Sequence, residues 1–257
     1  MKTQLILLLA AALHCAAQSP EQSTPLPQEI AGIRARAEKG EPKAQTFLGM
    51  AYGNGQGVTE DQVEAVKWLR KAAEQGEAIA QNDLGLRHAL GQGGLPKDDS
   101  EAVKLFRKAA EQGFAKAQKN LALMYERGSG VPKDESEAAK WFRKAADQGL
   151  AEAQHFLGVM YAKGEGVAKD EAESVRWWLK AANQGYAEAQ SYLGFMSAKG
   201  QGLPKDEVEG YKWVWLAAAQ GDEQAKLGIK ILDGTMPPEQ RAEGERRARE
   251  FKPAPAK

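Results

Sequence analysis

The feature that most constrains the fold of this chain is a short segment that returns, with few changes, at a nearly constant spacing. Its clearest form is KDESEAAKWFRKAADQG, residues 133–149. The other four copies span residues 61–76, 98–113, 170–185 and 206–221. Five copies predict a repeat protein, because a unit this short cannot bury its apolar face without its neighbours.

Each copy of this segment is predicted to form one helix. Asp134 is a favourable N-cap and Glu137 follows three residues later, so we expect a capping box in which each side chain caps a backbone N–H group. Gly149 suits the left-handed conformation that ends a helix. Apolar residues recur at the spacing of one buried stripe: Ala138, Trp141, Phe142, Ala145 and Ala146.

A second predicted helix precedes each copy, over residues 44–52, 80–90, 117–127, 153–163 and 189–199. An anchoring glutamine begins each pattern: Gln45, Gln81, Gln118, Gln154 and Gln190. A leucine follows three residues later, and in four copies a glycine follows the leucine: Gly49, Gly85, Gly158 and Gly194. Because glycine inside a helix costs about 1 kcal/mol relative to alanine, we expect the partner helix to approach closely at this position.

The recurring segments form a consensus over residues 44–221: A-x-A-Q-x-x-L-G-x-x-Y, then G-x-G-V-x-K-D, then E-A-x-x-W-x-x-K-A-A-x-x-G. The consensus resembles the Sel1-like repeat family, a relative of the tetratricopeptide repeats. The resemblance implies an all-α fold, an α/α superhelical solenoid of about five Sel1-like helix-turn-helix repeats with helical caps. It also implies a non-enzymatic adaptor that holds a protein or peptide partner on its concave face.

The predicted repeats are residues 44–76, 77–113, 114–149, 150–185 and 186–221. Residues 29–43 are predicted to form a half-repeat, a lone second helix that begins the stack. Residues 222–251 are predicted to form capping helices, followed by a disordered tail over residues 252–257. Trp215 and Leu216 give the fifth repeat an apolar face, which we expect the cap to cover; the alternative is an exposed partner patch.

The N-terminus is predicted to be a signal peptide, residues 1–17. Lys2 precedes an apolar core over residues 5–13, and the small residues before position 18 suit cleavage after Ala17. We therefore expect an exported protein, periplasmic or secreted, with no transmembrane segment after cleavage and a flexible linker over residues 18–28. The alternative is a lipoprotein anchored through Cys15, the only cysteine.

Charge and residue types exclude several functions. Lys plus Arg and Asp plus Glu are both 35, a balance that argues against a sequence-independent nucleic-acid binder. Only His88 and His155 remain after signal cleavage, in different repeats, so we expect no metal site, and no cofactor. We name no catalytic residues and expect a monomer.

One alternative to a scaffold stays open, an envelope-associated small-ligand binder or hydrolase acting on β-lactam or peptidoglycan-like material. Certain exported, cysteine-rich members of the family that this chain resembles are linked to β-lactam binding or hydrolysis. This chain lacks the paired cysteines of those members. We therefore predict a scaffold function in preference to an enzymatic one.

Partner specificity is expected where the repeats differ while their frame is constant. On the first helix of each pair, the variable positions follow the anchoring glutamine. The predicted partner-binding residues are Asp83, Arg87, Lys119, Asn120, His155, Phe156 and Tyr192. His155 is expected to point outward, where a solvated surface histidine is an equally good interpretation. Phe156 and Tyr192 either contact the partner or seal adjacent repeats.

Overall fold

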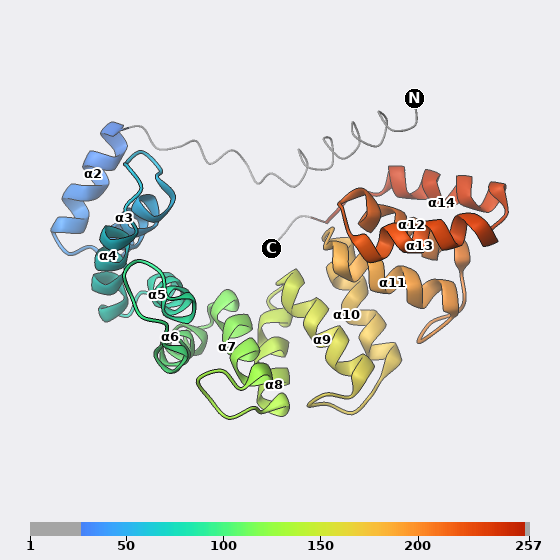
Figure 1. Cartoon of the computed structure of the whole chain (residues 1–257), viewed down its shortest axis with the longest axis horizontal. Coiled ribbons are helices and arrows are strands. Elements are labelled where there is room, and N and C mark those ends of the chain that lie inside the picture. The colour runs from blue at the N-terminus through green and yellow to red at the C-terminus, as the bar shows by residue number, and fades with distance from the viewer. Residues whose placement is uncertain (1–26, 255–257) are drawn as a thin grey trace. The chain divides into compact units, whose positions relative to one another are not determined.

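The computed structural model describes residues 27–254, so the predicted signal peptide and most of the predicted linker lie outside the described residues. Figure 1 shows these residues as a run of helices joined by short loops, with no strand among them. They divide into an N-terminal unit, residues 27–145, and a C-terminal unit, residues 146–254. This all-α architecture confirms the predicted fold class.

The N-terminal unit contains α2 to α7 and most of α8. Its helices are α2 (Pro27–Glu38), α3 (Pro42–Asn54), α4 (Gln62–Glu74), α5 (Ala78–Leu90), α6 (Asp99–Glu111), α7 (Ala115–Arg127) and α8 (Glu135–Asp147). The C-terminal unit contains α9 (Ala151–Lys163), α10 (Glu171–Asn183), α11 (Ala187–Lys199), α12 (Glu207–Ala219), α13 (Glu223–Thr235) and α14 (Pro238–Glu250). From α2 to α7 and from α9 to α13, each helix packs on the next one in the chain. The first helices of the repeats begin two residues earlier than predicted.

Aspartates begin the second helices, as the sequence predicts, but only half of the capping box forms. The Asp134 carboxylate accepts a hydrogen bond from the backbone N–H of Glu137 at 2.9 Å. Glu137 does not return the interaction, because its carboxylate binds Lys140 at 3.0 Å and the backbone N–H of Asp134 donates to the Tyr125 carbonyl. The N–H of Asp134 is therefore satisfied by the preceding helix rather than by Glu137.

Close helix packing explains the glycine that follows each leucine. A Cβ atom on Gly158 would lie 2.6 Å from Trp178 Nε1, and one on Gly85 would lie 2.8 Å from the Phe106 ring. A side chain at either position would force the facing ring or its helix to move. The prediction of close approach at these glycines is confirmed.

The anchoring glutamines form a ladder of buried hydrogen bonds that the sequence pattern did not reveal. In the C-terminal unit, the Gln190 amide donates to the Ala182 carbonyl at 3.1 Å and its oxygen accepts from Gln220 at 2.8 Å. Gln154 makes the same two contacts, with the Ala146 carbonyl and with Gln184. In the N-terminal unit the ladder passes through Gln45 and Gln75, then through Gln81 and Gln112. Each rung joins a first helix to the ends of the second helices on both sides.

The chain ends by folding back over the fifth repeat. Helix α13 ends at Thr235, and α14 then packs on α12 (Figure 1). Leu216 lies in one core with Ala248 of α14, and the Phe251 ring meets the Trp213 ring edge-on at 5.3 Å. The first residues of the predicted disordered tail are held as well, because the backbone N–H of Ala254 donates to the Asn183 carbonyl at 2.7 Å.

Candidate functional site

Two adjacent positions on each first helix differ in whether their side chains can contact a partner. The seam position directly follows the anchoring glutamine, and the face position is the next residue. Seam residues are Thr46, Asn82, Lys119, His155 and Ser191. Face residues are Phe47, Asp83, Asn120, Phe156 and Tyr192.

The seam residues are mostly buried, which corrects the prediction that they point outward. Only 7% of His155 and 2% of Ser191 are exposed, and Thr46 and Asn82 are equally buried, whereas Lys119 is half-buried. The Thr46 hydroxyl lies 3.2 Å from the carboxylate of Glu77, the residue that caps the next first helix. The seam therefore packs neighbouring first helices together.

In the N-terminal unit, the predicted partner-binding residues Asn120, Arg87 and Asp83 each form a hydrogen bond within the chain. The Asn120 amide donates to Asn82 Oδ1 at 2.9 Å, and both side chains are buried. The Arg87 guanidinium donates to Gln62 Oε1 at 2.6 Å, so it is directed toward the start of α4. Asp83 accepts a long hydrogen bond of 3.4 Å from the Asn82 amide.

Burial governs the charges of Asp83 and Arg87. Loss of solvent raises the pKa of the Asp83 carboxyl, against the opposing effects of the Asn82 hydrogen bond and the Arg87 charge. The same loss of solvent lowers the pKa of the Arg87 guanidinium, with Asp83 opposing the shift. Both residues are therefore half-buried, and Arg87 bonds to Gln62.

In the C-terminal unit, five rings form an aromatic cluster: His155, Phe156, Trp178, Tyr186 and Tyr192. The His155 ring centroid lies 5.4 Å from Tyr186, 5.4 Å from Tyr192 and 5.7 Å from Phe156. Tyr192 also stacks on Trp178 at 5.0 Å. The structure thus brings together His155, Phe156 and Tyr192, three of the predicted partner-binding residues.

Burial favours the uncharged forms of His155 and Tyr186. Burial lowers the pKa of His155 to about 4, and no hydrogen-bond partner reaches its Nδ1 atom. Burial, together with the nearby carboxylates of Glu188 and Glu152, raises the pKa of Tyr186 to about 12. Tyr192 is 40% exposed, so one aromatic side chain of the cluster is presented to solvent on a support of packed rings.

Sequence reasoning missed Trp178 and Tyr186 as members of this cluster. Trp178 hydrogen-bonds the His155 carbonyl through Nε1 at 3.2 Å, which ties α10 to α9. Tyr186 precedes the first residue of α11. The sequence did contain a signal at position 178. The equivalent residues in the other repeats are Leu69, Phe106, Phe142 and Val214, so Trp178 is the largest side chain at this position.

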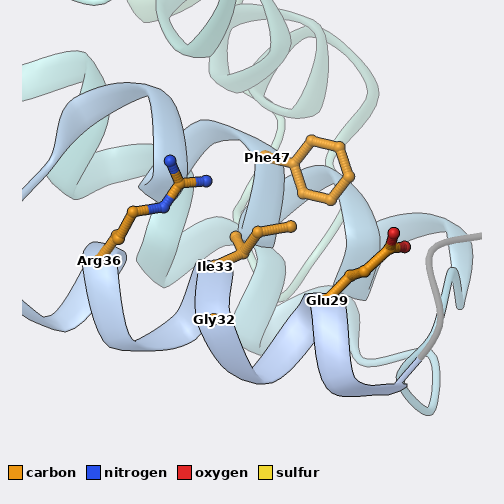
Figure 2. A pocket seen from close by; sticks show the side chains of 5 residues that line it. All are labelled: Glu29, Gly32, Ile33, Arg36 and Phe47. Atoms are coloured by element: carbon orange, nitrogen blue, oxygen red, sulfur yellow. The ribbon is translucent and has the colours of Figure 1, made fainter.

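A hollow of about 550 Å³ lies at the start of the N-terminal unit. Figure 2 shows its lining, with Glu29, Gly32, Ile33 and Arg36 along α2 and the ring of Phe47 facing them from α3. We call this the α2–α3 hollow. It contains no predicted partner-binding residue.

Residues 27–254 contain no group of three or more His, Cys, Asp or Glu side chains placed to hold a metal ion. No helix in this part of the chain is long and apolar enough to span a bilayer.

Comparison with known proteins places the chain in a family. The model of the Sel1 repeat matches five successive segments, residues 42–77, 78–114, 115–150, 151–186 and 187–222. The chain belongs to the Sel1 repeat family. No curated protein sequence matches this Sel1 repeat chain.

Two solved structures resemble this Sel1 repeat protein closely. A Sel1 repeat protein from Oxalobacter formigenes is 32% identical with a TM-score of 0.77, over 97% of this chain and 98% of that one. The antigen c5321 of uropathogenic Escherichia coli, described as protective and as displaying an SLR fold, is 37% identical with a TM-score of 0.76. That match covers 86% of this chain but 48% of c5321, so the chain spans about half of that relative.

Proposed function

We propose that this protein is an exported, non-enzymatic Sel1 repeat scaffold that binds a protein or peptide partner on the face carried by its first helices. Sel1 repeats generally mediate protein interaction, which supports a binding role for this chain. The observation that carries the proposal is the aromatic cluster with Tyr192 at its surface. Tyrosines that are exposed but rigidly supported are frequent energetic centres of protein interfaces, because few rotamers are lost on binding.

Exposure and hydrogen bonding divide the predicted partner-binding residues into two groups. Asp83, Lys119, Phe156 and Tyr192 keep some exposure, whereas Asn120 and His155 are buried and Arg87 bonds to Gln62. We assign direct contact to the first group and a supporting role to the second. Glu188 is exposed near the cluster, so a partner that offers an apolar or aromatic side chain flanked by a basic residue would suit the C-terminal unit.

The binding role is tested with a pair of matched variants. Tyr192→Ala removes the exposed ring, and Leu179→Ala removes a side chain of similar exposure, 42%, from the second helix α10. Partners captured from envelope extract by the wild type are identified, and their affinities for the three proteins are then measured by titration. We expect Tyr192→Ala to raise the dissociation constant about 30-fold, as for a loss of ~2 kcal/mol, and Leu179→Ala to leave it unchanged. Equal affinities for all three proteins would contradict the assignment.

Export is tested separately, by the mature N-terminus of the protein in its host. Cleavage after Ala17 predicts a protein that begins at Gln18 and is released with the soluble envelope fraction. The alternative is a lipid-modified Cys15 in the membrane fraction. A chain that retains Met1 in the cytoplasm would contradict both forms of the proposal.

A further inference from the structure

The two ends of the described repeat array each carry half of a repeat. Within residues 27–254, α2 is a second helix with no first helix before it. Helix α13 is a first helix, but the helix that follows it, α14, packs on α12 instead of pairing with α13. Each end therefore has a surface that would be covered in the interior of the array.

At the N-terminal end, the α2–α3 hollow marks the place of the missing first helix. Its α2 lining, Glu29, Gly32, Ile33 and Arg36, takes the places that Ala65, Trp68, Leu69 and Ala72 hold in the first full repeat. Those four residues of α4 are buried. The contact that covers them is visible at Gly49 of α3, where an added Cβ atom would lie 2.8 Å from the Leu69 side chain. In the α2–α3 hollow the equivalent surface is open, and Phe47 forms its wall with 40% of its surface exposed (Figure 2).

At the C-terminal end, α13 presents two unusually exposed apolar side chains. Leu227 is 60% exposed and Ile231 is 66% exposed, one turn apart on the same side of the helix. Leu227 occupies the seam position of α13, which is buried at His155 and Ser191. Ile231 occupies the place of Phe195, whose ring packs against Gly228 of the next first helix.

The interior of the C-terminal unit shows what covers a seam position. The seam residue His155 of α9 packs on the face residue Tyr192 of α11, with ring centroids 5.4 Å apart. At the open N-terminal end, the face residue of the first full repeat is Phe47, also aromatic and exposed. Leu227 and Phe47 are therefore the two halves of a contact that the chain already builds between α9 and α11.

We propose that the protein associates head to tail with a second copy of itself, with α13 of one copy filling the α2–α3 hollow of the next. Leu227 and Ile231 pack on Phe47 and Ile33, and the two helices together complete one repeat across the junction.

The two surfaces differ, so the contact is heterologous and leaves a free end of each kind after every addition. Such contacts form open chains unless the rotation between copies closes a ring. The mean mass should therefore rise steadily with concentration. This proposal replaces the expectation of a monomer, and it is independent of partner binding at Tyr192.

Sedimentation velocity of the full chain over roughly a hundredfold range of concentration tests the association. Two variants each block one end: Leu227→Gln with Ile231→Gln at the C-terminal end, and Phe47→Gln at the N-terminal end. All three side chains are exposed, so circular dichroism should show both variants folded. We expect the wild type to grow in mass with concentration, and each variant alone to have a dissociation constant at least about tenfold higher.

Mixing the two variants is the decisive step. Each variant keeps the end that the other has lost, so the mixture should form a one-to-one dimer that cannot grow further. Leu90→Gln, at a residue of similar exposure on α5, should associate as the wild type does. A wild type that is monomeric throughout would overturn the proposal, and so would a mixture that stays monomeric or a Leu90→Gln variant that loses association.

Discussion

At the residue scale, the buried histidine of the aromatic cluster, His155, supports the exposed ring of Tyr192. His155 occupies a variable position, yet its ring packs among Phe156, Tyr186 and Tyr192 and its Nδ1 atom lacks a hydrogen-bond partner. A charged imidazolium at this place would lose its hydration without gaining a counter-ion. His155 therefore supports the packing beneath Tyr192 and does not offer a charge to a partner.

The burial of His155 predicts a pH dependence of stability. The folded-state pKa, about 4, lies below the ordinary value of 6.5, so the unfolded chain binds the proton more readily. The stabilisation is complete above pH 6.5 and is lost as pH falls toward 4, by up to about 3 kcal/mol. Urea unfolding of the wild type and of His155→Phe across this range should show a steeper slope in the wild type. Parallel curves for the two proteins would contradict the assignment.

Two glycines inside helices of the C-terminal unit should respond oppositely to alanine. Gly194 faces the Gly210 carbonyl, which a Cβ atom would approach to 2.9 Å, whereas nothing lies within 4 Å of a Cβ atom on Gly234. Gly194→Ala should lower the free energy of unfolding by about 1–3 kcal/mol through overpacking. Gly234→Ala should raise it by up to about 1 kcal/mol through helix propensity. Thermal unfolding of both variants measures the signs, and a stabilised Gly194→Ala would refute the close contact.

At the element scale, the frame of the repeat could be predicted and the joints between repeats could not. Asp134 and Gly149 act at the ends of their helix as predicted, because caps depend on local sequence. The seam was predicted to face outward, because a helical period shows which residues share a side but does not show which neighbour covers that side. Arg87 is a further example, since its bond to Gln62 joins residues 25 apart in the chain.

The glutamine ladder is expected to contribute to the stability of each repeat. Gln190 is almost fully buried, and Gln190→Met would remove one hydrogen bond to the Ala182 carbonyl and one from the Gln220 amide. We expect a loss of about 1–3 kcal/mol in the free energy of unfolding. Gln224→Met is the matched control, because Gln224 is exposed on α13. Chemical denaturation of both variants measures the free energy of unfolding. Equal stability of the two variants would exclude a structural role for the ladder.

The last helix should stabilise the C-terminal unit. Deleting residues 239–257 removes the contacts of Ala248 and Phe251 with the core around Leu216 and Trp213. The truncated chain should melt at a lower temperature and bind more of a hydrophobic dye than the full chain, because it exposes that core. A melting temperature equal to that of the full chain would show that α14 does not serve as a cap.

At the scale of the whole molecule, the family and fold followed from the sequence because five copies of one pattern leave little freedom. The candidate site followed only in part. His155, Phe156 and Tyr192 were all predicted as partner-binding residues, and their rings lie in one cluster. Their supports, Trp178 and Tyr186, come from another helix and from the turn before α11, and no local pattern joins them to the first helix. What the partner is depends on chemistry outside this chain.

The proposal of partner binding on the first-helix face is tested most directly by photo-crosslinking in the living host. A photoreactive phenylalanine analogue replaces Tyr192 in one strain and Leu179, similarly exposed on α10, in another. The account predicts a discrete crosslinked species from position 192 and none from position 179, with both proteins folded and equally abundant. A species formed equally from both positions, or formed from position 179 alone, would contradict it.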